Sequence, residues 1–188
     1  MDKPFLENEL IERLRQGDEA AFRTVCDVNQ DRIYNAILCI VQSVGDAEDL
    51  TQEVFVEAFL KIDSFKGESK LSTWLYSIAI NKALYHRRYW RAKKRLKSVL
   101  SIFHLTDADD VPDFVHPAAL LEQKERSKQL FKAIDNLPEK QRIAFVLRQS
   151  DNLSYAEIAD VMHTSIPSVE SLLFRAKQNL KSVLRGKI

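Results

Sequence analysis

The sequence predicts an all-α protein of two small helical domains joined by a linker. Gly and Pro are scarce, at four and five residues among 188, and apolar residues recur at helical spacing. Hydrophobic residues make up 45% of the chain, which is enough to build compact cores. The helical pattern fails over residues 99–118, an acidic stretch that contains Pro112 and Pro117. We interpret this stretch as a linker between domains of residues 1–98 and 119–188; a structured segment that lies in a basic channel is the alternative.

The first two helices are expected over residues 6–15 and 19–41. Gly17 breaks the chain between them, and Asp18 is placed to cap the second helix by accepting hydrogen bonds from its first amide groups. The second helix carries apolar side chains at helical spacing, namely Phe22, Val25, Cys26, Ile33, Ile37 and Ile40. The two cysteines are expected to be small buried hydrophobes, because no metal-binding spacing surrounds them.

A third helix is expected to begin after Gly45, because Asp46 and Asp49 have the spacing of a capping box, with Asp in place of the usual Glu or Gln. Its apolar stripe consists of Leu50, Val54, Ala58 and Ile62. Acidic side chains decorate the rest of this helix. Up to residue 60 the chain holds thirteen acidic residues against five basic ones.

The charge reverses over residues 61–100, which hold eleven basic residues against two acidic ones. This part comprises a polar loop over residues 63–70 and a long helix over residues 74–98, capped by Ser72 or Thr73. The second half of the helix is basic and has aromatic residues interleaved, which can stack or pack: Tyr85, Tyr89 and Trp90. An acidic surface joined to a basic one indicates two partners of opposite character, and the basic surface most simply binds nucleic acid.

The second domain is predicted to contain a helix-turn-helix. Pro138 marks the start of a helix that continues to Gln149. The sequence Ser-Tyr-Ala-Glu at residues 154–157 is a capping box that opens the next helix. A polar turn, His163-Thr164-Ser165, precedes a last helix over residues 166–184, which can enter the major groove of DNA by its N-terminal half. A purely structural helical hairpin is the alternative.

Other classes of function find no support in the sequence. No apolar run approaches the roughly 20 residues that span a bilayer, and the N-terminal residues hold no signal-peptide core, so we expect a cytoplasmic protein without membrane insertion. No nucleotide-binding loop, catalytic triad or metal cluster is visible. We therefore expect neither an enzyme nor a bound metal ion or cofactor.

Three segments, in the same order along the chain, resemble the extracytoplasmic-function (ECF) sigma factors of the sigma-70 family. Residues 46–55, DAEDLTQEVF, resemble the polymerase-binding part of sigma region 2. Residues 65–81, which contain the sequence TWLY, resemble its promoter-melting part, and residues 153–180 resemble the helix-turn-helix of region 4. The resemblance implies a factor that binds core RNA polymerase, directs it to promoter DNA and assists melting, under the control of an anti-sigma factor.

The resemblance also implies roles for residues of region 2. Asp49, Gln52 and Glu53 lie within about one helical turn and would bind the polymerase; a solvated helix face is the alternative. Contacts with the −10 promoter element would come from Phe65, Lys66, Gly67, Glu68, Ser69 and Asn81. Phosphates would be held by Arg87, Arg88, Arg91, Lys94 and Arg95. A site that captures an unstacked base favours the melted state of the DNA. Trp74 stands among apolar positions, so we expect it in the core and not in a stacking platform.

In region 4, five residues would face the −35 element: Ser168, Ser171, Phe174, Arg175 and Lys177. Four positions depart from the family pattern. His163 replaces the usual turn Gly, so a left-handed backbone there costs more, whereas Pro167 is tolerated in a first helical turn. Glu170 and Leu172 stand where basic residues are common, so the sequence does not predict the −35 preference.

Two other functions are open at this stage. One is a sigma mimic that sequesters an anti-sigma factor without touching DNA; the basic run over residues 82–97 argues against it, because a mimic needs no phosphate contacts. The other is a helix-turn-helix transcriptional repressor, which leaves the pattern of residues 46–81 unexplained.

Overall fold

The computed structural model describes residues 3–102 and 129–185, and every regular element in these ranges is helical. The elements are α1 (Lys3–Arg15), α2 (Glu19–Val41), α3 (Val44–Leu60), the short 3-10 helix η1 (Ile62–Ser64), α4 (Leu71–Ile102), α6 (Glu139–Asp151), α7 (Tyr155–Val161) and α8 (Ile166–Arg185). Residues 129–135 form a further helical segment. Residues 103–118 of the predicted linker, and the start of the second domain, lie outside the described residues.

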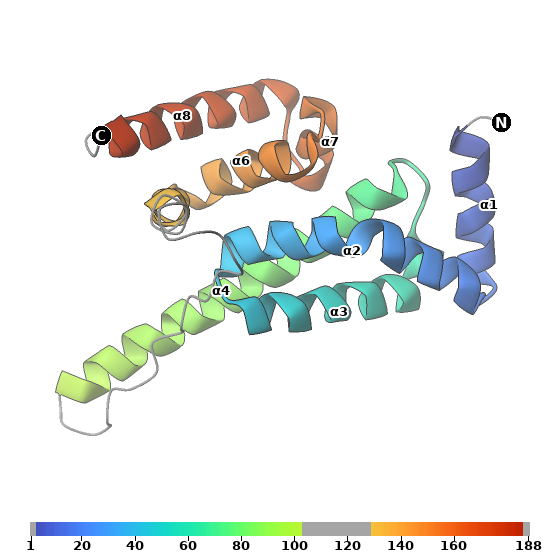
Figure 1. The fold of residues 1–188 in the computed structure, drawn as a ribbon, viewed down its shortest axis with the longest axis horizontal. Coiled ribbons are helices and arrows are strands. Elements are labelled where there is room, and N and C mark those ends of the chain that lie inside the picture. Colours follow the sequence, from blue (N-terminus) through green and yellow to red (C-terminus); the bar gives the residue numbers. More distant parts are fainter. Residues whose placement is uncertain (1–2, 103–128, 186–188) are drawn as a thin grey trace, which may run out of the picture.

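The helices form two bundles that lie side by side (Figure 1). In the first bundle α2, α3 and α4 pack against one another, and α1 contacts α2. In the second bundle α8 packs on both α6 and α7. The bundles meet where α6 packs on α2 and α7 packs on α4, so α8 lies on the outer side, away from the first bundle (Figure 1).

The core follows the helical stripes that the sequence predicted. Ile33, Ile37 and Ile40 of α2 and Val54 of α3 are almost completely buried, as are Leu147, Ile158 and Val169 in the second bundle. Burial of each such side chain contributes about 1.5–3 kcal/mol. Cys26 and Cys39 form no disulfide and pack half-buried against this core, and burial raises the pKa of the Cys26 thiol. Both cysteines therefore pack against the core, but neither is as buried as the sequence predicted.

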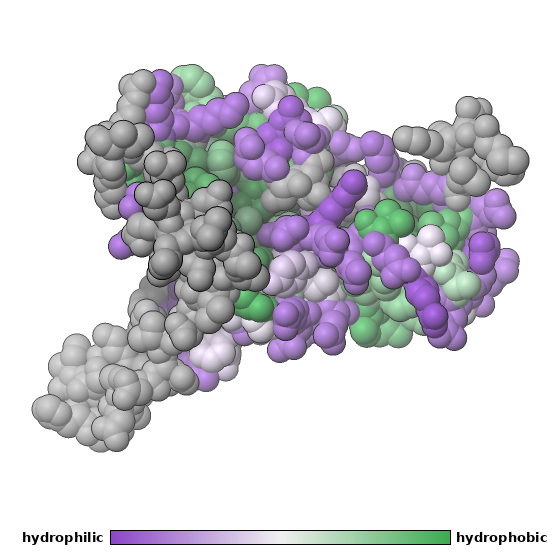
Figure 2. All heavy atoms as spheres, in the orientation of Figure 1, coloured by the Kyte–Doolittle hydropathy of each residue, from purple (hydrophilic) through white to green (hydrophobic). Residues whose placement is uncertain are grey.

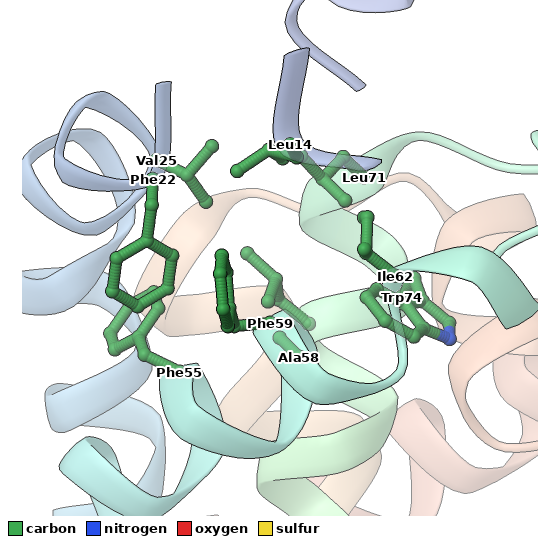
Figure 3. A pocket seen from close by; sticks show the side chains of 10 residues that line it. Leu14, Phe22, Val25, Phe55, Ala58, Phe59, Ile62, Leu71 and Trp74 are labelled. Carbon is green, nitrogen blue, oxygen red and sulfur yellow. The ribbon is translucent and has the colours of Figure 1, made fainter. Parts of the chain in front are cut away.

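Aromatic side chains meet where α1, α2, α3 and the start of α4 converge (Figure 3). They surround an apolar cavity of about 10 Å³, whose apolar lining offers no hydrogen-bond partners to an ordered water. Trp74 points toward this cavity from α4, and its ring centroid lies 5.2 Å from that of Phe65. The predicted packing of Trp74 against the core is therefore confirmed, although its side chain is only half-buried.

The junction between α2 and α3 differs from the prediction. Gln42 ends α2 in a left-handed conformation, with φ at 60°, and its N–H donates to the Leu38 carbonyl. Ser43 then caps α3 by accepting from the Asp46 N–H at 3.4 Å. Gly45 and Asp46 therefore lie inside the first turn of α3, and Asp46 is not its cap. The prediction was wrong because it took Gly45 as the chain-breaking residue, whereas Gln42 and Ser43 make the reversal.

The long helix α4 begins at Leu71, three residues earlier than predicted. The Leu71 N–H donates to the Glu7 carboxylate of α1 at 2.7 Å, so the cap comes from another helix and not from Ser72 or Thr73. Thr73 is buried within the first turn. The helix continues to Ile102, which moves the end of the first helical unit four residues into the predicted linker.

The predicted helix-turn-helix is present. The Ser154 side chain accepts from the Glu157 N–H, and the Glu157 carboxylate accepts from the Ser154 N–H at 2.8 Å, which completes the capping box. His163 in the turn has φ at 48°. It therefore adopts the left-handed backbone that a Gly would adopt without steric cost, as expected for a residue at this position of the turn.

Candidate nucleic-acid and protein interfaces

The structure brings Asp49, Gln52 and Glu53 together on the exposed face of α3, where they line an open hollow. Val56 and Leu60 line the same hollow, because they follow Asp49 by seven and eleven residues and project from the same side of the helix. Both are strongly exposed, at 56% and 75%. Sequence reasoning missed these two residues, although their position off the buried stripe was the available signal.

Apolar surface is visible in this part of the molecule. Figure 2 shows apolar side chains where the N-terminal half of α2 and the C-terminal half of α3 lie in Figure 1. The exposed large apolar residues of these helices are Val28, Val56, Phe59 and Leu60. An exposed apolar patch with a polar rim is typical of a protein-binding surface.

Lys82 of α4 partly neutralises the acidic face of α3. Its Nζ lies 2.9 Å from Glu53 Oε2 and 3.0 Å from Glu57 Oε2. Burial alone would lower the pKa of Lys82, but the hydrogen bonds and charges of the two carboxylates outweigh it and raise this pKa. Hydrogen bonds from Lys61 and Lys82 hold the pKa of Glu57 below its ordinary value. Among the described residues Asp49 forms no ion pair, so its charge faces solvent.

The predicted −10 loop is exposed at Lys66, Gly67 and Glu68, and Ser69 is half-buried. Gly67 has φ at +72°, which suits a residue without Cβ. Phe65 is a correction: only 4% of it is exposed, because its ring packs on Trp74 in the core. The Phe65 side chain is therefore not available to DNA in this conformation. Its carbonyl accepts a hydrogen bond from Arg15 at 2.7 Å.

Arg87 is a second correction. Its side chain is 8% exposed, and its Nη1 donates to the carbonyl of Ile40 at 2.9 Å, at the C-terminal end of α2. Its Nη2 binds the Asp135 carboxylate. Burial lowers the pKa of Arg87, and the nearby Asp135 only partly offsets this effect. Arg87 therefore joins α2 and α4 to residues 129–135 and does not present its charge to phosphates in this conformation.

A second buried arginine shares the same counter-ion. Arg142 of α6 is 1% exposed, and its Nη1 lies 2.9 Å from the Asp135 carbonyl and 3.4 Å from the Asp135 carboxylate. Burial, followed by the charge of Arg87, lowers the pKa of Arg142 to about 10, so it stays charged at neutral pH. Its Nε has no hydrogen-bond partner among the described residues. Sequence reasoning missed Asp135 and Arg142, because only the tertiary packing brings them together.

The remaining predicted contacts of α4 are exposed. Asn81, Arg88 and Arg91 face solvent, but Arg88 lies 2.7 Å from the Glu139 carboxylate of α6. The side chains of Lys94 and Arg95, farther along α4, lie outside the described residues. Asn81 is ten residues into α4, or about 15 Å along the helix axis from its start. The exposed aromatic residues are Tyr85, Tyr89 and Trp90. The indole N–H of Trp90 donates to His86 at 2.9 Å, and the Lys93 Nζ lies 4.5 Å from the centroid of the Trp90 ring.

The outer face of α8 carries the predicted −35 residues. Phe174, Arg175 and Lys177 are exposed, and Ser168 and Ser171 are half-buried. Val169, Leu173, Ala176 and Leu180 hold the opposite face against α6 and α7. At about 100° per residue, Ser168, Ser171 and Arg175 fall within a narrow arc, and Lys177 lies at the far margin of the exposed face. This arrangement can present Arg175 and the hydroxyl groups to base edges while Lys177 reaches a phosphate.

Comparison with known proteins identifies both bundles. The family model described as Sigma-70 region 2 matches residues 27–96, and that described as Sigma-70, region 4 matches residues 127–180. The ECF RNA polymerase sigma-E factor of Escherichia coli K12 is 32% identical over 95% of this chain and 94% of its own length. The chain belongs to the ECF group of the sigma-70 family. It is a sigma factor, a transcription initiation factor that directs RNA polymerase to promoters.

Other relatives agree with this assignment. The ECF sigma-E factor of Haemophilus influenzae is 32% identical, with 98% of each chain covered. Among solved structures, CnrH in complex with the cytosolic domain of CnrY shares the fold with a TM-score of 0.72 at 19% identity, over 97% of this chain and 99% of that one. The sigma factor RpoE of Bartonella quintana, solved with the anti-sigma factor NepR, has a TM-score of 0.63 at 25% identity, over 89% and 98%. Family membership over the whole chain favours a sigma factor over a helix-turn-helix repressor.

The part of the chain that the structure describes provides neither a metal cluster nor a membrane span. Its residues contain no group of three His, Cys, Asp or Glu side chains that could hold a metal ion. No helix among them is long and apolar enough to cross a membrane.

Proposed function

We propose that this sigma factor divides its work between residues 1–98 and residues 119–188. The first unit would bind core polymerase and the −10 element, and the second would bind the −35 element. The two family models, which match separate parts of the chain, support this division. The polymerase works in the cytoplasm, and we place this sigma factor there as well.

Core polymerase binds the acidic face of α3 in this proposal. Asp49, Gln52 and Glu53 supply polar contacts, and the exposed Val56 and Leu60 supply apolar area beside them. The observation that carries the proposal is this exposed carboxylate face of α3. Within it, Asp49 forms no ion pair with any basic residue that the structure describes. Polar groups around an apolar centre are the usual composition of a specific protein interface.

Promoter DNA binds two other surfaces. Lys66, Gly67, Glu68, Ser69 and Asn81 would contact the −10 element, with phosphates held by Arg88 and Arg91. Ser168, Ser171, Phe174, Arg175 and Lys177 would contact the −35 element. Phe65 would act by anchoring the loop to the core through its packing on Trp74, and Arg87 would act by fixing α4 in place. Binding that depends on Lys and Arg contacts to phosphates should weaken steeply as salt rises.

Transcription reconstituted with core polymerase tests the proposal. The double variant D49A/Q52A should lose polymerase affinity while its helical content stays unchanged. A matched control is D27A/Q30A, which removes an exposed Asp and Gln with the same spacing from α2. Equal polymerase affinity of the two variants would remove α3 from the interface. Absence of any promoter-specific transcript with the unmodified chain would refute the function as a whole.

A second variant tests the −35 contact. Replacement of Arg175 by Ala should weaken promoter affinity by about 1–3 kcal/mol if Arg175 contacts a base, because a bidentate base contact has this value. Unchanged affinity would remove Arg175 from the site.

We also propose that an anti-sigma factor regulates this chain. The solved structure of the Bartonella quintana sigma factor, at 25% identity, contains an anti-sigma partner. Such a partner would compete for the same surfaces as polymerase and DNA. Copurification of a chain that blocks reconstituted transcription would support this regulation.

A further inference from the structure

Helix α1 binds the chain on both sides of the exposed part of the −10 loop, residues 66–68. On one side, Arg15 Nη2 donates to the carbonyl oxygen of Phe65 at 2.7 Å. On the other side, the backbone N–H of Leu71 donates to Glu7 Oε1, also at 2.7 Å. The two contacts join groups that are 50 and 64 residues apart in the sequence, so only the fold brings them together.

The apolar side of α1 fixes this helix on the first bundle. Ile11 and Leu14 are buried, and α1 packs on α2 and on η1, the short helix just before the loop. Leu14 and Leu71 line the same apolar cavity (Figure 3). Glu12 orients the Arg15 side chain, because its Oε1 lies 2.6 Å from Arg15 Nη1. Both loop contacts therefore start from a helix that is itself held in place.

Each contact satisfies a backbone group that no helix of its own can satisfy. The Leu71 N–H belongs to the first turn of α4, where the helix offers no carbonyl partner. The Glu7 carboxylate fills this place, and its negative charge suits the positive end of the helix dipole. Phe65 lies between η1 and α4, and its carbonyl accepts from the guanidinium of Arg15. Hydrogen bonds to charged groups are stronger than neutral ones, so both ends of the loop are firmly fixed.

A loop with fixed ends has fewer conformations to lose when it binds DNA. Ordering each residue costs free energy, and a loop that is ordered on folding does not incur this cost when it binds a ligand. Capture of an unstacked base is the step that would benefit, because its free energy offsets the cost of opening the duplex. The loop keeps its binding part accessible, since residues 66–68 are exposed.

We propose that Glu7 and Arg15 are positioning residues for base capture in the −10 element. They do not touch the base; they hold the loop in its base-binding conformation. The inference rests on the proposed role of the loop in −10 recognition. It goes beyond the family match, because both residues precede residue 27, where the match to Sigma-70 region 2 begins.

Limited digestion by trypsin tests the anchoring in the free full-length protein. Lys66 is an exposed cleavage site, but the protease needs an extended segment, so the cleavage rate follows the population of the opened loop. In E7A and R15A, the initial rate of cleavage after Lys66 should rise about three- to tenfold, measured by mass spectrometry. The matched controls are E9A, at an exposed carboxylate of α1, and R23A, at an exposed arginine that pairs within α2. Unchanged cleavage in E7A and R15A would overturn the inference.

Transcription by the reconstituted holoenzyme tests the effect on base capture. E7A and R15A should each initiate about three- to tenfold less from a duplex promoter, which is first mapped with the unmodified protein. With mismatched bases across the −10 element of the same promoter, the defect should fall below about twofold, because the strands are already separated. E7Q should initiate as the unmodified protein does, since the Gln amide oxygen can accept from the Leu71 N–H.

A stability control separates positioning from a general loss of folding. I37V removes a methyl group from the core of α2, at a residue that does not line the cavity beside Leu71. It should lower the urea midpoint, as E7A does, but affect the duplex and mismatched templates equally. A selective defect in I37V, or equal defects of E7A and R15A on both templates, would overturn the inference.

The unmodified protein separates the two levels of the argument. If it gives a promoter-specific transcript but E7A and R15A show no selective defect, the positioning role alone fails. If it gives no transcript on any template, the proposed function fails and the positioning role fails with it, whatever the digestion shows.

Discussion

Removal of either of two neighbouring arginines of α4 should change the free energy of unfolding by very different amounts. Arg87 is buried and bonded to the carbonyl of Ile40 and to Asp135, whereas Arg88 is 66% exposed and pairs only with Glu139 among the described residues. We predict that R87A lowers the free energy of unfolding strongly and that R88A hardly changes it. The two substitutions remove identical chemical groups from adjacent positions, so each is the other's control.

The expected magnitude follows from the hydrogen bonds and ion pairs that each substitution removes. R87A leaves the Ile40 carbonyl without its guanidinium donor, and an unsatisfied buried acceptor costs about 1–3 kcal/mol. Asp135 is deprived of one partner, but it keeps Arg142 and is 38% exposed, which limits this further cost to about 1 kcal/mol. The total is about 2–4 kcal/mol for R87A. For R88A we expect about 0–1 kcal/mol, the usual range for an exposed pair.

Urea unfolding followed by circular dichroism measures the difference. A loss of about 3 kcal/mol of stability in a chain of this size lowers Tm by about 6–12 °C, which thermal unfolding would show independently. The reasoning would be refuted if R87A and R88A had the same unfolding midpoint. It would also be refuted if R87A kept full stability but lost DNA affinity, since Arg87 would then act as a phosphate ligand.

Three further predictions concern the turn, the capping box and the core. H163G should raise the free energy of unfolding by about 0.5–1 kcal/mol, because Gly adopts the left-handed φ of 48° at residue 163 without strain. H163A should not raise it. Equal urea midpoints for H163G and H163A would contradict this prediction. Folding lowers the pKa of Glu157 from its ordinary value of 4.5 to about 2, chiefly through a hydrogen bond from Lys70, which stabilises the folded state at pH values above 4.5. This stabilisation is lost as the pH falls toward about 2. The urea midpoint of E157Q should therefore depend less on pH between about 2 and 4.5 than the midpoint of the unmodified protein. I37A removes a fully buried side chain and should cost about 2–5 kcal/mol in urea unfolding, with an unaffected midpoint ruling out the assigned core.

Much of the fold could be predicted because its signals are local. Apolar spacing predicted the bodies of α2 and α3, Pro138 predicted the start of α6, and Ser154 with Glu157 predicted the start of α7. The helix ends that were wrong depend on residues outside the local pattern. Leu71 begins α4 because Glu7, far away in the sequence, caps it. Gln42 reverses the chain in a left-handed conformation that composition does not predict.

Only part of the candidate sites could be predicted from the sequence. The face of Asp49, Gln52 and Glu53 could be found because residues three and four apart share a side of a helix. The burial of Phe65 and Arg87 could not, since each depends on segments that pack from elsewhere in the chain.

The sequence by itself determined that the chain is helical, that it ends in a helix-turn-helix and that it resembles ECF sigma factors, because periodicity, capping and motif order are written in neighbouring residues. Only the tertiary structure decided which basic residues are exposed and which are paired. Arg87 and Arg88 are adjacent and chemically identical, but they project about 100° apart from α4. One meets Ile40 and Asp135 in the interior and the other meets Glu139 at the surface, since burial and charge pairing depend on distant segments that local sequence does not encode.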